Sequence, residues 1–236
     1  MQQYFAKDKK GNTLILNNDD LNHIKNVMRM REKDKIIVAY EDKSYICSLN
    51  KDLLSSTIES VFKDYEDNTA FIMYIPLLSE EKLSEIFKHG TELGVTEFVI
   101  VQYNHCKYKL KKNDYEKKIN RWNKIVKEAS EQSYRINKPI VDKIISVDNI
   151  IDECNVKILC SLDKNNVKHI SEVLTCKNYN DTISVAFGPE GGLSEIEEDI
   201  LVSKGFIKTS LGNNILRTET VPLYIASVKS YLNGSE

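Results

Sequence analysis

Two glycine-bearing loops, each placed directly after a predicted strand, constrain this chain more than any other feature. The residues 183–187 form an apolar run of strand type, and Gly188-Pro189-Glu190-Gly191-Gly192 follows it. A second short strand over 206–211 leads to Gly212. Glycine lets the backbone adopt positive φ and come close to a bound group. The two loops therefore predict a pocket lined by backbone groups.

The surrounding pattern predicts an α/β fold from Ala70 onward. Ser194 and Glu197 have the S-x-x-E spacing of a capping box, so a helix is expected to begin there. Strands and helices alternate, which is typical of a mostly parallel sheet covered on both faces. The expected strands are 70–75, 95–101, 156–162, 182–187 and 206–211, and the expected helices are 83–93, 115–133, 167–174 and one beginning near Thr218 or Thr220.

Residues 1–68 have a different pattern and are expected to form a separate β-rich domain, followed by a second domain over 69–236. One helix contains residues 23–30, with an acidic cap at Asp19 or Asp20 and a basic rim. Such a unit is either a small barrel that grips RNA or a structural cap on the larger domain, and spacing alone leaves both open. Its expected strands are 13–16, 36–40, 45–49 and 57–62.

Charge and composition narrow the class of protein. The formal net charge is −2, but His105 to Lys143 contains 12 Lys and Arg against 5 Asp and Glu. A basic segment favours an anionic partner such as nucleic acid, although a solvated helix face gives the same signal. No apolar run approaches the length of a membrane span, and no signal-peptide core is present at the start. Five cysteines without a C-x-x-C pair favour reduced thiols, so we expect a cytoplasmic protein without a membrane partner.

The glycine loops match no common nucleotide fingerprint. The sequence contains neither a P-loop nor a G-x-G-x-x-G motif, and no G-x-S-x-G nucleophile elbow. Its four histidines lie apart, so no metal site is expected. The predicted pocket has Glu190, Arg217 and Glu219 nearby. It suits a cofactor with an adenine edge, a ribose and a charged tail.

Five motifs in order resemble the RsmE family of ribosomal RNA methyltransferases, which are SPOUT-class enzymes that use S-adenosylmethionine. Two of them are Gly188-Pro189-Glu190-Gly191-Gly192-Leu193-Ser194 and the segment from Leu211-Gly212 to Ile215-Leu216-Arg217-Thr218-Glu219-Thr220. The other three are His23-Ile24-x-x-Val27-Met28-Arg29-Met30, Thr91-Glu92-Leu93-Gly94-Val95, and Glu131-Gln132-Ser133-x-Arg135 with Pro139. The resemblance runs through both expected domains.

The resemblance implies a PUA-like β-barrel followed by a SPOUT-type parallel sheet with a C-terminal trefoil knot. It implies methyl transfer from S-adenosylmethionine to N3 of a uridine in 16S ribosomal RNA of the small subunit, by a homodimer formed through the last helix. Arg217 would stabilise the developing charge on the uracil, and Glu190 or Glu219 would take the N3 proton or orient the loops. The implied cofactor contacts are Leu162, Gly188, Glu190, Gly191, Gly192, Leu211, Gly212, Ile215, Leu216 and Thr218.

Basic residues in both domains are candidate RNA contacts. They are Lys25, Arg29, Arg31, Lys107, Lys124 and Arg135. The chain departs from the family pattern at Asn214, where arginine is usual, and at Asn104-His105-Cys106-Lys107, where a T/S-E-R motif is usual. These departures keep two alternatives open: a SPOUT enzyme acting on a ribose 2′-OH or another base, and a non-catalytic RNA-binding protein of ribosome assembly.

Overall fold

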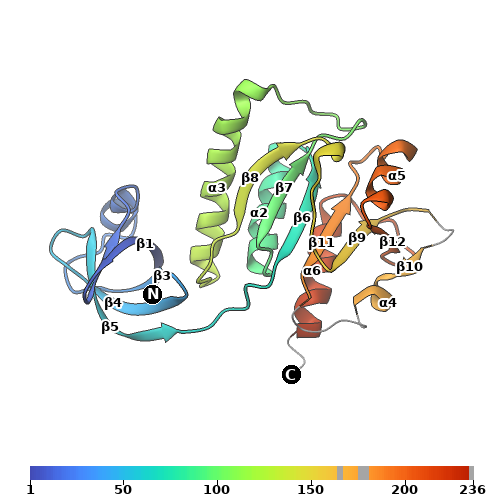
Figure 1. The fold of residues 1–236 in the computed structure, drawn as a ribbon. Helices are drawn as coiled ribbons and strands as arrows, with labels where there is room; N and C mark the ends of the chain where they lie inside the picture. Colours follow the sequence, from blue (N-terminus) through green and yellow to red (C-terminus); the bar gives the residue numbers. More distant parts are fainter. Residues whose placement is uncertain (164–166, 175–180, 234–236) are drawn as a thin grey trace. The chain divides into compact units, whose positions relative to one another are not determined.

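The computed structural model describes residues 1–163, 167–174 and 181–233 (Figure 1). The chain forms two compact units, and the first contains Met1–Asp67 together with Lys127–Lys138. The second contains Asn68–Val126 and Pro139–Glu236. Residues 127–138, which the sequence assigned to the second domain, therefore pack as part of the first unit.

The first unit is a closed five-stranded barrel with strand order β1-β2-β5-β4-β3. Neighbouring strands are antiparallel except β1 and β3, which pair in parallel and close the barrel. Tyr4, Leu16 and Ile36 are among the side chains that fill its core. The strands are β1 (Gln3–Lys10), β2 (Thr13–Leu16), β3 (Lys35–Tyr40), β4 (Lys43–Leu49) and β5 (Ser55–Lys63).

The four strands predicted in this unit are confirmed, but β1 is missing from the prediction. Only the first half of β1 is buried, and its second half, Lys7 to Lys10, is exposed and charged, which breaks the strand pattern. The predicted helix is also shorter and less regular than expected. A three-residue helix, α1 (Asp20–Asn22), continues into a π-helical turn over His23–Val27. Arg29 then ends it with a φ of 54°, the left-handed conformation in which a helix commonly stops.

Buried ion pairs attach residues 127–138 to the barrel within this first unit. Lys127 Nζ lies 2.7 Å from Asp20 Oδ1 and 2.7 Å from Glu131 Oε1. The Arg135 side chain is 4% exposed, and its Nε lies 3.3 Å from Glu66 Oε1. Buried charges are tolerated when they are paired, so these pairs make the segment an integral part of the unit.

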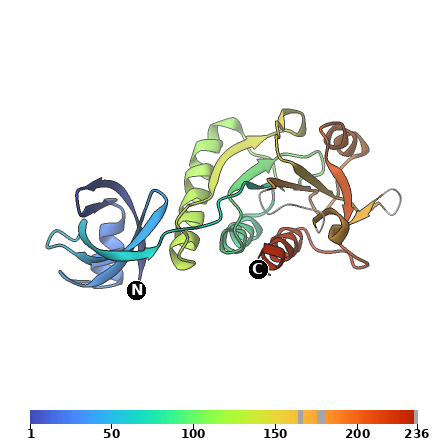
Figure 2. The ribbon, with the colours of Figure 1, turned by 60° about the horizontal axis from the view of Figure 1, so that its bottom comes forward.

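The second unit is a seven-stranded, entirely parallel sheet in the order β10-β12-β9-β11-β6-β7-β8. Figure 2 shows α2 and α6 side by side on one face of the sheet and α5 on the other. The strands are β6 (Phe71–Pro76), β7 (Glu97–Val101), β8 (Ile140–Ile145), β9 (Val156–Cys160), β10 (Lys168–His169), β11 (Ile183–Phe187) and β12 (Ile207–Ser210). The helices are α2 (Glu80–Glu92), α3 (Tyr115–Gln132, of which residues from Lys127 onward belong to the first unit), α4 (Ile170–Leu174), α5 (Glu195–Ser203) and α6 (Thr220–Asn233), with 3₁₀ turns at Lys112–Asp114 and Val147–Asn149.

The predicted parallel α/β sheet is confirmed, and its central strands explain why the prediction worked. All five residues of β11 are buried, as expected for a strand covered on both faces. The edge strand β8 was missed because only two of its six residues, Val141 and Ile144, are buried. The predicted helix at 167–174 is wrong in its first half, where β10 adds a short edge strand before α4 begins.

The strand order brings three loops to one edge of the sheet. β12, β9 and β11 are adjacent and parallel, so their carboxyl ends meet at the same edge. The segments that follow them are the β9 loop (161–163), the β11 loop (188–193) and the β12 loop (211–219). These are the two glycine-bearing loops of the sequence and one further loop. Ligands of open α/β sheets bind in this position.

Candidate cofactor-binding site

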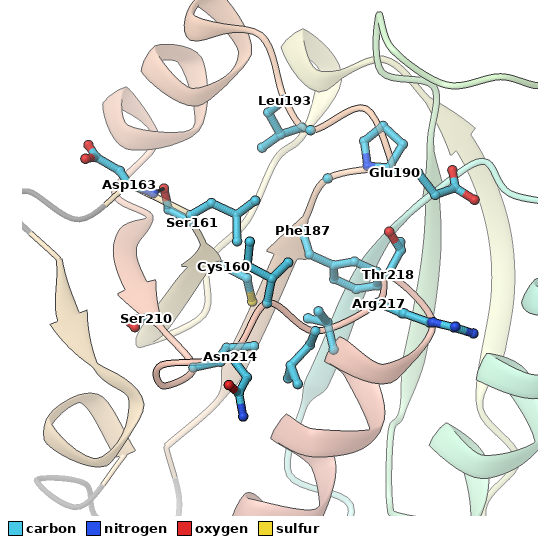
Figure 3. Close-up of a pocket in the computed structure, with 18 of the residues that line it drawn as sticks. Cys160, Ser161, Asp163, Phe187, Glu190, Leu193, Ser210, Asn214, Arg217 and Thr218 are labelled. Carbon is cyan, nitrogen blue, oxygen red and sulfur yellow. Dashed lines mark hydrogen bonds between the residues drawn. The ribbon is translucent and has the colours of Figure 1, made fainter.

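The three loops enclose a cavity of about 1170 Å³, which is large enough for a nucleoside cofactor. Cys160, Phe187 and Ser210, the last residues of β9, β11 and β12, are among the residues that line it (Figure 3). Apolar side chains such as Phe187 and Leu193 line the cavity together with backbone groups of the glycine segments. The cavity therefore offers a ligand both apolar surface and backbone N–H and C=O groups.

The β11 loop needs glycine at specific positions. A Cβ atom on Gly188 would lie 3.0 Å from the backbone nitrogen of Leu193 and 3.1 Å from the carbonyl carbon of Gly192, and neither atom can move without distorting the loop. Gly192 has a φ of 73°, and its N–H donates to Pro189 O at 2.9 Å. The loop is therefore a tight turn that only small residues can form.

The capping box predicted after this loop is confirmed. The Ser194 side chain accepts from the Glu197 N–H, and the Glu197 carboxylate accepts from the Ser194 N–H at 2.9 Å. The same carboxylate also accepts from the Asn104 N–H at 2.7 Å, and Glu197 is 3% exposed. One buried glutamate thus joins the start of α5 to the segment that follows β7.

The segment 104–107, which departs from the family pattern, packs against the β11 loop. His105 Nδ1 lies 3.2 Å from Gly192 O. A Cβ atom on Gly191 would lie 3.0 Å from His105 Cβ, so Gly191 is needed for this contact and not for positive φ. From the sequence, this segment was interpreted only as a possible change in RNA contacts. Its support of the β11 loop was missed because that contact joins residues far apart in the chain.

The β12 loop is more open. Gly212 has a φ of 121°, and the Ile215 side chain is 77% exposed. The carbonyl oxygen of Arg217 accepts from the N–H groups of Thr220 and Val221, so the loop ends by starting α6. Within the described part of the chain, no hydrogen bond connects residues 213–216 to another segment.

A lysine that the sequence interpretation missed connects the two loops. Lys82 Nζ lies 2.9 Å from Glu190 Oε1 on the β11 loop and 2.9 Å from Glu219 Oε2 on the β12 loop. The hydrogen bond to Glu190 and the ion pair with Glu219 raise the pKa of Lys82. The hydrogen bond from Lys82 lowers the pKa of Glu190. Partial burial raises the pKa of Glu219, but the contact with Lys82, a backbone hydrogen bond and the positive charges of Lys82 and Arg217 together lower it. Both glutamates are therefore anionic at neutral pH.

Arg217, the predicted electrostatic catalyst, is exposed at the cavity. Figure 3 shows Glu190 and Arg217 projecting to the same side of the loops, away from Asp163. The positive charge of Arg217 also contributes to the lowered pKa of Glu219. The three predicted catalytic residues are thus brought together, with Lys82 between the two carboxylates.

The predicted cofactor residues also come together. Those that line the cavity are Leu162, Gly188, Glu190, Gly192, Leu211, Gly212, Ile215, Leu216 and Thr218. Gly191 does not line it, because this residue faces His105. Asn214, at the position where the family usually has arginine, is exposed and lines the cavity.

The predicted RNA contacts are distributed over both units. Lys25, Arg29 and Arg31 are exposed on the first unit, whereas Lys107 and Lys124 are exposed on the second. Arg135 differs from them because its guanidinium is buried against Glu66. Its burial gives Arg135 a structural role and argues against a direct phosphate contact.

Among residues 1–163, 167–174 and 181–233, no three His, Cys, Asp or Glu side chains gather as a metal site would require. The helices in the same ranges include none with the length and apolar character needed to cross a membrane.

Comparison with known proteins places the two units in one family context. Residues 66–230 match the family described as RNA methyltransferase domain, and residues 16–59 match the RNA methyltransferase PUA domain. The chain is 34% identical to ribosomal RNA small subunit methyltransferase E of Bacillus subtilis, covering 98% of this chain and 96% of that protein. It is 28% identical to the protein of the same name from Aquifex aeolicus, covering 97% and 98%. The crystal structure of a ribosomal RNA small subunit methyltransferase E from Neisseria gonorrhoeae bound to S-adenosylmethionine is similar with a TM-score of 0.81, 26% identity and 98% coverage of both chains.

Proposed function

Because this chain belongs to the ribosomal RNA small subunit methyltransferase E family, we propose that it methylates N3 of a uridine in 16S ribosomal RNA with S-adenosylmethionine. The observation that carries the proposal is the cavity of about 1170 Å³ at the carboxyl ends of β9, β11 and β12. Its loops carry the family motifs, in a chain that matches the relatives over nearly their whole length. The resemblance of these motifs is what supports uridine N3 as the acceptor.

The residues of the cavity fit S-adenosylmethionine. Gly188 shapes the β11 loop along the cavity, since a Cβ there would collide with the loop's own backbone. Phe187 and Leu193 offer apolar surface for an adenine ring, and the anionic Glu190 and Glu219 suit a cationic ligand. When bound, S-adenosylmethionine supplies an electrophilic methyl group on a sulfonium.

Methylation then requires that the N3 proton of the uracil be removed and that the resulting negative charge be stabilised. Uridine N3 carries a proton that must leave, and negative charge develops on the ring as it does. We assign the stabilisation of this charge to Arg217, whose exposed guanidinium stands beside the cavity. Glu190 and Glu219 are weak bases because Lys82 lowers the pKa of each carboxyl. We therefore favour an orienting role for both glutamates over proton abstraction.

The resemblance supports three further proposals. We propose that the cavity loops form a trefoil knot, that domains of residues 1–68 and 69–236 act together on 16S ribosomal RNA in the cytoplasm, and that α6 forms a homodimer. In α6, Tyr231 is 75% exposed and Tyr224 and Val228 are partly buried against the core, which leaves apolar surface for a second copy. Light scattering tests the dimer, and a monomer at micromolar concentration would exclude it.

The direct test is methylation of small ribosomal subunits from a strain that lacks the gene. Purified protein and S-adenosylmethionine are added, and the ribosomal RNA is digested and analysed by mass spectrometry. We expect one new 3-methyluridine in 16S ribosomal RNA. A methyl group on a ribose 2′-OH or on another base would establish the alternative SPOUT activity, and no methyl group at all would favour a non-catalytic assembly protein.

A paired experiment separates RNA binding from chemistry. Arg29→Gly removes a guanidinium at a backbone φ of 54°, which glycine adopts without strain, so the fold is preserved. This variant should bind RNA more weakly and lower the magnitude of the log–log salt slope by about 1. Arg217→Ala should instead lower the single-turnover rate by about a hundredfold, with RNA affinity little changed. If Arg217→Ala loses only binding, its catalytic assignment is wrong.

A further inference from the structure

Lys82 occupies a position in the fold that no motif of the sequence indicates. It lies in the first turn of α2, which follows β6, and β6 is the neighbour of β11 in the sheet. Its ammonium reaches Glu190 and Glu219 at the same distance of 2.9 Å. A single side chain thus ties the segments that follow β6, β11 and β12.

This contact matters more for the β12 loop than for the β11 loop. The β11 loop is also held by Glu197, through the capping box and the Asn104 N–H. In the β12 loop, the ion pair with Lys82 is the side-chain contact that connects Glu219 to a distant element. Leu211 and Leu216 pack against the core at either end of the β12 loop, and Lys82 adds an ion pair from a distant element at Glu219.

We propose that Lys82 is a positioning residue for methyl transfer, which holds the β11 and β12 loops at the separation that S-adenosylmethionine requires by pairing with Glu190 and Glu219. This inference rests on the proposed function. Lys82 acts through the two glutamates, whose positions it fixes. Both glutamates line the cavity in which we propose that the cationic cofactor binds.

Electrostatics gives the proposal a measurable signature. Both carboxylate oxygens lie 2.9 Å from one nitrogen, so without that nitrogen two like charges face each other at short range. Like charges at such a distance raise the pKa of one carboxyl strongly. Protonation of one carboxyl at low pH then removes the repulsion, whereas at high pH both carboxyls are charged and the loops repel. Removing Lys82 should thus make cofactor binding depend on pH.

Other charged and titratable groups lie around the pair. Lys107 lies near Glu190, Arg217 lies near Glu219, and the thiol of Cys106 faces Glu190 with a pKa raised by burial. The stabilisation from the two lowered carboxyl pKa values is present above the ordinary carboxyl range and is lost in acid. The stabilisation from the raised Lys82 pKa is present below the ordinary lysine range and is lost in strong base. Between these limits the wild-type affinity should be flat.

The test measures S-adenosylmethionine binding by calorimetry between about pH 5 and about pH 9, because like-charge coupling raises the upper pKa of a carboxyl pair to about 5 and partial burial raises it further. Lys82→Met should bind about tenfold more weakly than wild type at neutral pH and more weakly still as the pH rises. Lys82→Arg should restore most of the affinity and the flat profile, because it keeps the positive charge. Lys82→Met with Glu219→Gln should also lose the pH dependence, since only one anion remains.

Lys118→Met is the matched control. Lys118 has the same solvent exposure as Lys82, at 28% against 29%, and pairs with Glu80 on the same unit but away from the cavity. This variant should bind S-adenosylmethionine as wild type does. Circular dichroism and thermal unfolding establish that each variant is folded.

The outcomes distinguish this inference from the proposed function. A wild-type protein that fails to bind S-adenosylmethionine overturns the proposed function and this inference with it. A wild-type protein that binds, with Lys82→Met binding equally at every pH, overturns the inference alone. A loss in Lys82→Met that is independent of pH and equal in Lys82→Arg also overturns it, because the charge then plays no part.

Discussion

The β11 loop and the β12 loop face the same cavity but are built in opposite ways. The β11 loop is fixed by its own backbone turn at Gly192, by the capping box of α5 and by contacts from the segment 104–107. The β12 loop has an exposed middle, and its side-chain link to a distant element is the ion pair of Glu219 with Lys82.

This difference indicates a division of labour in ligand binding. A preorganised loop loses little conformational entropy when a ligand arrives, so its contacts contribute fully to affinity. An open loop loses more, but it can close over the ligand and shield it from water. We expect substitutions in the β11 loop to abolish binding and substitutions in the β12 loop to weaken it by degrees.

The largest effect is expected from Gly188→Val. The added side chain meets backbone atoms of Leu193 and Gly192 at about 3 Å, and a loop held on all sides cannot relax. S-adenosylmethionine affinity should fall by about a hundredfold or more in calorimetry. Gly11→Ala is the control for backbone strain without a collision, because a φ of 59° strains an added side chain while no neighbour lies within 4 Å of the added Cβ. Should Gly188→Val keep wild-type affinity, the β11 loop is not the rigid side of the cavity.

The second effect concerns the anchor of the β11 loop. Glu197→Ala removes a buried carboxylate that accepts hydrogen bonds from the N–H groups of Ser194 and Asn104. Leaving these donors unpaired should lower the free energy of unfolding by about 2–3 kcal/mol, with a matching loss of cofactor affinity. Glu195→Ala, at an exposed first-turn position of the same helix, should cost less than about 1 kcal/mol. Equal losses in chemical denaturation would mean that the capping box does not anchor the loop.

The same contrast explains what the sequence could and could not predict. The β11 loop was predictable because its determinants are local: a buried strand, two glycines and an S-x-x-E spacing lie within fifteen residues of one another. Lys82 was not predictable in this way, because its partner Glu190 is 108 residues away and one lysine in a helix looks like any solvated charge. The same applies to His105, whose contact with Gly192 spans 87 residues.

Prediction of the fold from the sequence is limited in the same way, because only local patterns are visible. Central strands such as β11 and β9 are predictable because they are apolar runs. The strand β1, whose second half is charged, and the edge strand β8, which is mostly exposed, lack such a run. The basic residue Arg135 looked like an RNA contact, yet folding buries it beside Glu66. Which charges are buried depends on contacts between distant segments, and these leave no pattern in the local sequence.

A third prediction tests whether the β12 loop adapts. Gly212 has a φ of 121°, which a residue with a Cβ rarely adopts, so Gly212→Ala forces the loop into another conformation. Because the neighbouring residues 213–215 are exposed, the loop can rearrange, and the unfolding free energy should change by less than about 1 kcal/mol. Cofactor affinity should fall by about tenfold, less than for Gly188→Val. A loss as large as that of Gly188→Val would show that both loops are rigid.

The smallest and most specific effect is expected from Ile215→Ala. An isoleucine that is 77% exposed contributes little to stability, so the free energy of unfolding should stay within about 0.5 kcal/mol of wild type. If the β12 loop closes over the cofactor, this side chain becomes buried on binding, and part of its transfer free energy of about 1.5–3 kcal/mol is offset by the cost of ordering the loop. Affinity should then fall about threefold to tenfold, and the heat-capacity change of binding should become less negative, because less apolar surface is buried. Calorimetry at several temperatures measures both quantities. Unchanged affinity and heat capacity would mean that the β12 loop stays open when the cofactor binds, and that the two loops differ in stability but not in movement.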